Sequence, residues 1–163
     1  PSIYSDGNLD FVEYCLNRNN FQLDYVEVSS TISLEASYSY SSMRRRRLKH
    51  ASKNNINIIK DWSYCSRFWV LLNDNLRKRY DTKPVHTFDE IQGLKEKFKS
   101  QIQLYLALLD GEILSGAVFF DTLNVRHLQY AATSEFGREL SSNDLVNHFA
   151  IEDAKIQKKK YQG

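Results

Sequence analysis

The sequence predicts a mixed α/β fold, in which a mostly antiparallel β-sheet is covered by helices. From Ile56 onward, the apolar periodicities give the order strand, helix, helix, three antiparallel strands and helix. This order is typical of an α/β sandwich. The segment from Glu112 to Asp121, the middle one of the three strands, is apolar on both faces. A strand of this kind needs helices on both sides of its sheet.

One helix, followed by one long strand or two short ones, is predicted before residue 38. Apolar side chains recur on one stripe from Asn8 to Asn19, and the Asn19-Asn20 pair is a stop signal for a helix. The stretch from Phe21 to Leu34 alternates in part and is rich in Val, Ile, Thr and Tyr. Most of these residue types favour β-strands.

Two helices flank a short strand in the next part of the chain. Tyr38 to Asn54 is expected to form a helix with a mixed face, and Ile56 to Ile59 a short strand. The second helix can be capped by Asp61 or Ser63. Its apolar side chains share one helix face, and they are Cys65, Phe68, Trp69, Leu72 and Leu76.

A helix and a three-stranded meander are expected in the middle of the chain. Thr87 and Glu90 have the spacing of a capping box, in which Thr87 accepts from the third amide and Glu90 reaches back. The apolar period then changes to two, and Asp110-Gly111 is a strong signal for a hairpin turn. The predicted strands are Ile102 to Leu109, Glu112 to Asp121 and Val125 to Thr133.

The last predicted element is a helix from Leu140 to Lys158, with Ser141 or Ser142 as its cap. The lysines at positions 158–160 lie at its end. Cations at the C-terminus of a helix interact favourably with the helix dipole. No further strand is expected before residue 163.

The composition is that of a globular protein without a membrane-spanning segment. Hydrophobic residues make up 42% and charged residues 26% of the chain, and the net charge of +2 gives no indication of nucleic-acid binding. No apolar run reaches the length of a membrane span, and no signal peptide opens the chain. Cys15 and Cys65 lie far apart, which favours free thiols in a reducing compartment. We therefore expect a cytoplasmic protein without a membrane partner.

Several classes of chemistry have no support in the sequence. None of the four histidines stands in an HExxH or Cys/His spacing, so no metal site is expected. His127 lies on a predicted strand, where a hydrogen-bonded histidine is favoured over a catalytic base. A nucleophile elbow, a Walker loop and paired carboxylates are also missing, which argues against hydrolases and kinases.

The run Arg44-Arg45-Arg46-Arg47 is the strongest local anomaly. On a helix, Arg44 and Arg47 share the packing face with Leu48 and Ala51, whereas the other two arginines point elsewhere. An arginine on a packing face needs a carboxylate or a phosphate as its partner. A structural ion pair is the favoured interpretation. The alternatives are binding of phosphate on a nucleotide, a coenzyme or tRNA, and attraction to a membrane surface.

The order of the elements resembles the GNAT acyltransferase fold, and local sequence adds a resemblance to FemAB-like proteins. The Arg-rich helix that ends in Lys53-Asn54-Asn55-Ile56 is similar to the linker helix of that family, which precedes the second acyltransferase-like domain. Three further stretches are similar to GNAT-type domains of bacteria, and they are Phe68-Trp69 to Tyr80, Lys83-Pro84-Val85-His86-Thr87 and Leu104 to Phe120.

The resemblance implies a division of the chain. Residues 39–163 are expected to form a GNAT/FemAB-like domain that lacks its last strands. Residues 1–38 are expected to be an N-terminal segment or the tail of a preceding GNAT-like half. We therefore expect the chain to be part of a longer bacterial protein.

The resemblance also implies a cofactor site. In the family, the pyrophosphate of coenzyme A sits on amides at the turn from the fourth strand into the third helix, where a helix N-terminus attracts anions. The corresponding turn runs from Thr133 to Ser141, and it has one glycine where the family loop has two. The cofactor-binding residues implied in this way are Gly137, Arg138, Ser141 and Ser142, while Arg44 and Arg47 are candidates for binding a phosphate or polyanion.

Two catalytic candidates follow from the same resemblance. Tyr130 and Ser134 belong to the strand that faces the thioester in GNAT enzymes. Acyl transfer there needs a base for the attacking amine and an acid, often a tyrosine, for the leaving thiolate. The implied function is transfer of an acyl or aminoacyl group from acetyl-CoA, or from aminoacyl-tRNA, to a small-molecule or peptide amine. The alternatives are a non-catalytic binding module of the same fold and tRNA binding through the arginine run.

Overall fold

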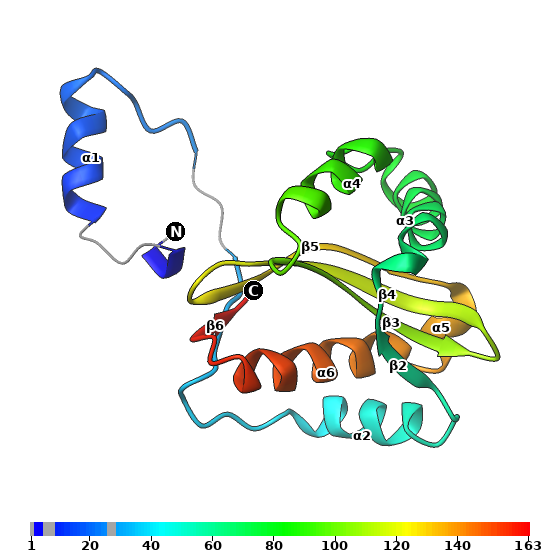
Figure 1. Ribbon diagram of the computed structural model, residues 1–163. Coiled ribbons are helices and arrows are strands. Elements are labelled where there is room, and N and C mark those ends of the chain that lie inside the picture. The colour runs from blue at the N-terminus through cyan, green and yellow to red at the C-terminus, as the bar shows by residue number, and fades with distance from the viewer. Residues whose placement is uncertain (1, 5–8, 26–28) are drawn as a thin grey trace.

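The computed structural model describes residues 2–4, 9–25 and 29–163. In this part of the chain, a six-stranded sheet lies between layers of helices (Figure 1), which confirms the predicted mixed α/β class. The strand order is β1-β6-β5-β4-β3-β2. The strands are β1 (Ile32–Ser33), β2 (Asn57–Lys60), β3 (Ile102–Leu109), β4 (Glu112–Asp121), β5 (Val125–Thr133) and β6 (Tyr161–Gln162). The helices are η1 (Ser2–Tyr4), α1 (Leu9–Arg18), α2 (Ser42–Ala51), η2 (Trp62–Tyr64), α3 (Cys65–Tyr80), α4 (Phe88–Lys97), α5 (Glu135–Glu139) and α6 (Ser142–Ile156).

The three central strands have the bounds that the sequence predicts. Neighbours from β2 to β5 are antiparallel, whereas β5 and β6 are parallel. β3 and β4 meet in a two-residue turn, in which Asp110 and Gly111 have φ angles of 49° and 81°. Positive φ angles at both positions match the twist of the flanking strands. The Asp110-Gly111 pair therefore sets the register of this hairpin.

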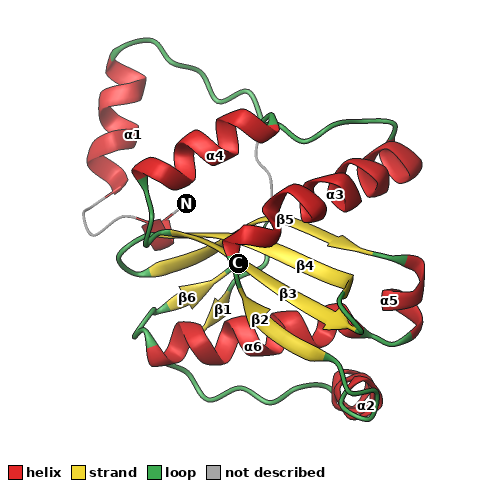
Figure 2. Ribbon diagram, turned by 45° about the vertical axis from the view of Figure 1, so that its right-hand side comes forward, coloured by secondary structure: helices red, strands yellow, loops and turns green. Residues whose placement is uncertain are grey.

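Both faces of β4 are covered by helices, as its apolar sequence predicts. Figure 2 shows α3 and α4 on one side of the sheet and α6 on the other. On the first side, Phe68 and Trp69 of α3 pack in one cluster with Val118 of β4. On the second side, Val146 of α6 packs in another cluster with Phe119 of β4. Alternate residues of the same strand thus serve two cores.

Local signals determine where α3 and α4 begin. The predicted capping box opens α4, because Thr87 Oγ1 accepts from the Glu90 amide at 3.2 Å and Glu90 Oε2 accepts from the Thr87 amide at 2.7 Å. Asp61 Oδ1 accepts from the Ser63 amide at 2.8 Å and caps η2, from which α3 continues without a side-chain cap of its own. The predicted cap residue thus acts one turn earlier than expected.

α2 is shorter than the helix predicted over Tyr38 to Asn54. It begins after Ser41, whose hydroxyl oxygen accepts from the Arg44 amide at 3.2 Å. It packs on α6 rather than on the sheet, and Ala51 is its buried residue. The serine cap therefore decides where the helix begins, and residues 38–41 are not helical.

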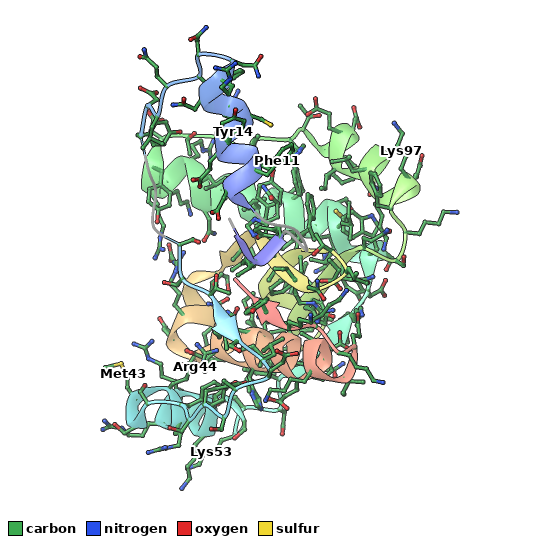
Figure 3. All side chains as sticks on the ribbon, turned by 90° about the vertical axis from the view of Figure 1, so that its left-hand side faces the viewer. Phe11, Tyr14, Met43, Arg44, Lys53 and Lys97 are labelled. Carbon is green, nitrogen blue, oxygen red and sulfur yellow. The ribbon has the colours of Figure 1, made fainter. Side chains whose placement is uncertain are left out.

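The prediction of one long strand or two short ones over Phe21 to Leu34 is wrong for most of the described part of this stretch. Residues 21–25 form no strand, and residues 26–28 lie outside the described residues. Among the described residues of this stretch, only β1 forms, and it pairs with the equally short β6. Phe21, Leu23 and Tyr25 are exposed, and the predicted helix α1 stands apart from the sheet with Phe11 and Tyr14 also exposed (Figure 3). A strand-like composition does not produce a strand where the segment does not pair with the edge of a sheet.

β6 is a strand that the sequence analysis did not expect. Lys158 has a φ angle of 57° just past the end of α6, where the chain turns back toward the sheet. Tyr161 and Gln162 then pair with Val125 and Arg126 of β5. A two-residue strand shows no apolar alternation, so periodicity alone cannot reveal it. Through β1 and β6, residues on both sides of position 38 share one sheet.

A buried ionic network joins β3, β4 and β5 to α6. Arg126 is 0% exposed. Its Nε and Nη2 donate to the Asp121 carboxylate at 2.9 and 2.7 Å, and its Nη1 donates to Asp153 Oδ2 at 2.8 Å and to the Ala150 carbonyl at 2.9 Å. Tyr105 Oη donates to the same Asp153 oxygen at 2.5 Å. The network thereby fixes α6 against the sheet.

We expect the free energy of unfolding to fall as the pH is lowered and Asp153 becomes protonated. Burial raises the pKa of Asp153, but hydrogen bonds from Tyr105 and Arg126 and the nearby cations outweigh burial, so the pKa lies below its ordinary value. The unfolded chain therefore takes up this proton at a higher pH than the folded chain. This contribution is present above about pH 4 and is lost as the pH falls through the folded pKa.

Urea unfolding at a series of pH values measures this dependence. Asp153→Asn is expected to show a shallower acid decline than the wild type. The matched control is Asp74→Asn, which removes the same charge from a carboxylate that is 49% exposed. Equal acid declines for Asp153→Asn and the wild type would contradict the prediction.

Candidate anion-binding site

A cavity of about 450 Å³ opens where β5 ends and is lined by three arginines from three helices. Arg47 comes from α2, Arg79 from the last turn of α3 and Arg138 from α5. Asp144 of α6 is the acidic residue in the lining. Figure 2 shows α5 beyond the end of β5, near the C-terminal end of α3. Because cations exceed anions in its lining, the cavity suits a negatively charged ligand.

Asn75 of α3 links the end of β5 to α5. Its Oδ1 accepts from Arg138 Nη2 at 2.9 Å and from the Thr133 amide at 3.3 Å. Its Nδ2 donates to the Leu71 carbonyl at 3.1 Å. The Asn75 side chain therefore connects the backbones of β5 and α3 to Arg138.

A second cavity of about 360 Å³ adjoins the first, and both are lined by Asn75, Arg79, Thr133 and Arg138. Lys78 adds another cation to the second cavity, whereas Asp74 and Glu135 add carboxylates. The positive charge is therefore concentrated along the boundary of the two cavities, at Arg79 and Arg138.

Arg44 and Arg47, which the sequence places on one face of α2, have different surroundings. Arg44 Nη1 lies 3.5 Å from Asp144 Oδ1, and its guanidinium lies over the Tyr40 ring at 5.1 Å. Arg44 thus forms the structural ion pair that we favoured. In Figure 3, Arg44 is seen at α2 on the side of α6, while Lys53 points away from the body. Arg47 is exposed and lines the larger cavity.

The turn after β5 differs from the single helix predicted from Leu140. Two helices, α5 and α6, meet at Ser141, which has a φ angle of 58°. Ser134 supplies the capping side chain, because its Oγ accepts from the Gly137 amide at 3.0 Å, whereas Ser141 precedes α6 without a capping bond. The helix that directly follows β5 therefore has only five residues.

Gly137 packs α5 closely against β4, and Ser142 joins the start of α6 to α5. A Cβ atom on Gly137 would collide with the carbonyl oxygen of Leu114 and would lie 2.8 Å from Ser142 Oγ. Ser142 is 0% exposed, and its hydroxyl donates to the Gly137 carbonyl at 3.0 Å. The amides of Gly137, Arg138 and Ser141 already donate within the turn. The turn thus presents the cavity with the side chain of Arg138 rather than with these amides.

Tyr130 and Ser134, the two catalytic candidates, are not part of the larger cavity's lining. Tyr130 Oη lies 2.6 Å from His86 Nδ1 and accepts from the His86 amide at 3.1 Å, and the Tyr130 ring is 7% exposed beside Trp69. Ser134 Oγ donates to the Leu114 carbonyl at 3.1 Å and lines the second cavity. The structure therefore separates Tyr130 from the three arginines.

His127 Nδ1 lies 2.8 Å from Tyr4 Oη, so this strand histidine is hydrogen-bonded, as we favoured. In the part of the chain that the structure describes, no group of three or more His, Cys, Asp or Glu side chains could hold a metal ion. Among the described helices, none combines the length and apolar character that crossing a bilayer requires.

Sequence reasoning missed Asn75, Arg79, Asn143 and Asp144, all of which line the larger cavity. Asn75 and Arg79 are four residues apart and therefore share one face of α3. That polar face was the only sign in the sequence that these two residues could belong to a site, since nothing in the sequence connects α3 with the turn near Arg138. The fold alone brings these residues together.

Comparisons with known proteins support the fold. No protein-family model and no curated protein matches the sequence. Among solved structures, FemX has a TM-score of 0.71 at 11% identity, with 81% of this chain and 51% of that chain covered. The C-terminal domain of a protein described as a lysylphosphatidylglycerol synthetase from Agrobacterium fabrum has a TM-score of 0.58 at 14% identity, with 81% and 44% covered. This chain thus spans about half the length of each neighbour, and it shares a GNAT-like fold with them.

Proposed function

We propose that this domain transfers an aminoacyl group from a phosphate-bearing donor to an amine. The observation that carries the proposal is the cavity lined by Arg47, Arg79 and Arg138 at the end of β5, in a domain with an acyltransferase-like fold. Guanidinium groups bind phosphate oxygens through paired, charge-assisted hydrogen bonds. The arginines would hold the donor, and the acyl carbon would lie along β5.

Three observations favour aminoacyl-tRNA over acetyl-CoA as the donor. Three amides of the turn after β5 already have acceptors within the turn, so these three are not available to a coenzyme pyrophosphate. The cavity also borders α2, on which Arg45, Arg46 and Lys49 are exposed, and such a surface suits an extended polyanion. The neighbour from Agrobacterium fabrum is named for a product with a lysyl group, which also supports an aminoacyl donor.

The proposed reaction forms a C–N bond and breaks the ester bond of the donor. The amine nitrogen attacks the acyl carbonyl and loses a proton, and the ribose oxygen leaves and gains one. Tyr130 stays the candidate acid from the sequence. Its hydrogen bond to His86 supports this role, because the imidazole could return a proton to the phenol.

Arg138→Ala is expected to weaken binding of aminoacyl-tRNA by about 10- to 150-fold, because it removes hydrogen bonds to a charged group worth about 1.5–3 kcal/mol. The assay incubates the protein with labelled aminoacyl-tRNA or labelled acetyl-CoA and a panel of primary amines, and it measures both donor binding and label transfer. The matched control is Arg67→Ala, since Arg67 is 48% exposed and pairs with Glu112. The control should bind and react as the wild type.

Each outcome of this assay has a defined meaning. The proposal is supported if the wild type transfers the label from aminoacyl-tRNA and Arg138→Ala slows this transfer. Transfer from acetyl-CoA alone would overturn the choice of donor. Binding of tRNA without transfer to any amine would favour the alternative, a non-catalytic module that binds polyanions through the exposed arginines of α2. Binding that is the same in Arg138→Ala and the wild type would remove the arginine cavity from the donor site.

A further inference from the structure

We infer that Asn75 is a positioning residue of the anion site and holds Arg138 ready for the donor's phosphate. The inference rests on the proposed function, since it assigns a role within the same site. Asn75 lies on α3, whereas Arg138 lies on α5, 63 residues later in the chain. The 2.9 Å hydrogen bond from Arg138 Nη2 to Asn75 Oδ1 is the contact that joins them.

The hydrogen bonds of Asn75 define a single orientation of its amide. Oδ1 accepts from both Arg138 Nη2 and the Thr133 amide, while Nδ2 donates to the Leu71 carbonyl. Exchanging the oxygen and nitrogen would place an NH₂ group against two donors and a carbonyl oxygen against an acceptor. The carboxamide is thus tied at both ends, and its oxygen has a fixed place at the cavity.

A fixed acceptor matters because Arg138 is otherwise exposed. An arginine side chain has considerable rotamer entropy, part of which a ligand must remove when it binds. Asn75 engages one Nη2 donor and leaves other N–H groups of the guanidinium for an anion. Arg138 is thereby partly ordered before the ligand arrives, and preorganisation of this kind raises affinity.

The neutral charge of Asn75 is as important as its geometry. A carboxylate at this position could accept the same two hydrogen bonds, but its charge would offset that of Arg138. An amide orients the guanidinium and leaves its positive charge available to the ligand. This difference separates a positioning residue from a partner in a structural ion pair.

The test measures binding of tRNA that carries no amino acid to the whole chain at several salt concentrations. Asn75→Ala is expected to weaken binding about 5- to 10-fold, within the range of coupling between contacting residues. It should keep the wild-type salt slope, which is the slope of the logarithm of the binding constant against the logarithm of the salt concentration. Arg138→Ala and Asn75→Asp are both expected to reduce that slope by about one, because each removes one effective positive charge. In the Arg138→Ala background, Asn75→Ala should have no further effect on binding.

The outcomes separate this inference from the proposed function. If Asn75→Ala and Arg138→Ala weaken binding additively, Asn75 does not act through Arg138, and the inference fails while the arginine site stands. If Asn75→Asp binds tRNA with wild-type affinity and slope, the argument from its neutral charge fails. If Arg138→Ala has no effect at all, both the inference and the proposed donor site are overturned. The Asn75→Asp protein keeps both acceptor bonds but loses the Nδ2 donation to the Leu71 carbonyl, so its salt dependence rather than its affinity tests the idea, even if Asn75→Ala folds poorly.

Discussion

Replacing Arg126 with Met is expected to lower the free energy of unfolding by about 3–5 kcal/mol, the loss that follows when one partner of a buried ion pair is removed. Asp121, which is 6% exposed, would lose both of its hydrogen bonds from the guanidinium. Asp153 and the Ala150 carbonyl would each lose one more. Met fills much of the space, so the loss is electrostatic rather than a large cavity. Urea unfolding followed by circular dichroism measures it.

Arg67→Met is the matched control for this prediction. Arg67 Nη2 lies 3.2 Å from Glu112 Oε2, but the two side chains are 48% and 82% exposed. Surface ion pairs contribute about 0–1 kcal/mol, so this variant should unfold close to the wild type. Similar losses for Arg126→Met and Arg67→Met would contradict the role that we give to the buried network.

Replacing Gly137 with Ala is expected to lower the free energy of unfolding by about 3 kcal/mol, at the upper end of the effects of overpacking. The new methyl group would collide with the Leu114 carbonyl, which belongs to the backbone of β4 and cannot turn away as a side chain can. α5 would have to move, and it carries Arg138 at the next position. We therefore expect weaker tRNA binding as well as lower stability, measured by urea unfolding and by titration with tRNA.

Gly93→Ala provides the comparison, because an added Cβ atom there meets nothing within 4 Å. Gly93 lies inside α4, where alanine is favoured over glycine by about 0.5–1 kcal/mol. This variant should be as stable as the wild type or slightly more stable, with unchanged tRNA binding. A Gly137→Ala protein with wild-type stability would show that α5 does not pack on β4 as described.

The central sheet and its adjoining helices could be predicted because the rules that define them act over short stretches. Apolar alternation and the Asp110-Gly111 turn give β3 and β4 with their observed bounds. The Thr87 capping box begins α4, and the apolar stripe of α3 includes the buried Phe68 and Trp69. Each of these features depends on residues a few positions apart, so the sequence displays them directly.

Part of the candidate site could also be predicted. The resemblance directed attention to the turn after β5, and Arg138 does line the cavity there. It also assigned Gly137 and Ser142 to a cofactor, and that role stays a prediction. The structure adds that Gly137 packs closely on β4 and that Ser142 donates to the Gly137 carbonyl. Sequence alone could not show these contacts, because a glycine that lets a ligand approach and a glycine that lets a strand approach look the same.

By itself, the sequence determined the class of fold, the central strands, the capping box of α4 and a surplus of arginine on α2. Only the tertiary structure decided which charges are paired and which are available. It buries Arg126 between Asp121 and Asp153, pairs Arg44 with Asp144, and leads Arg79 and Arg138 to one cavity with Asn75 between them. The physical reason is that the energy of a charge depends on its burial and on its partners, most of which come from distant parts of the chain.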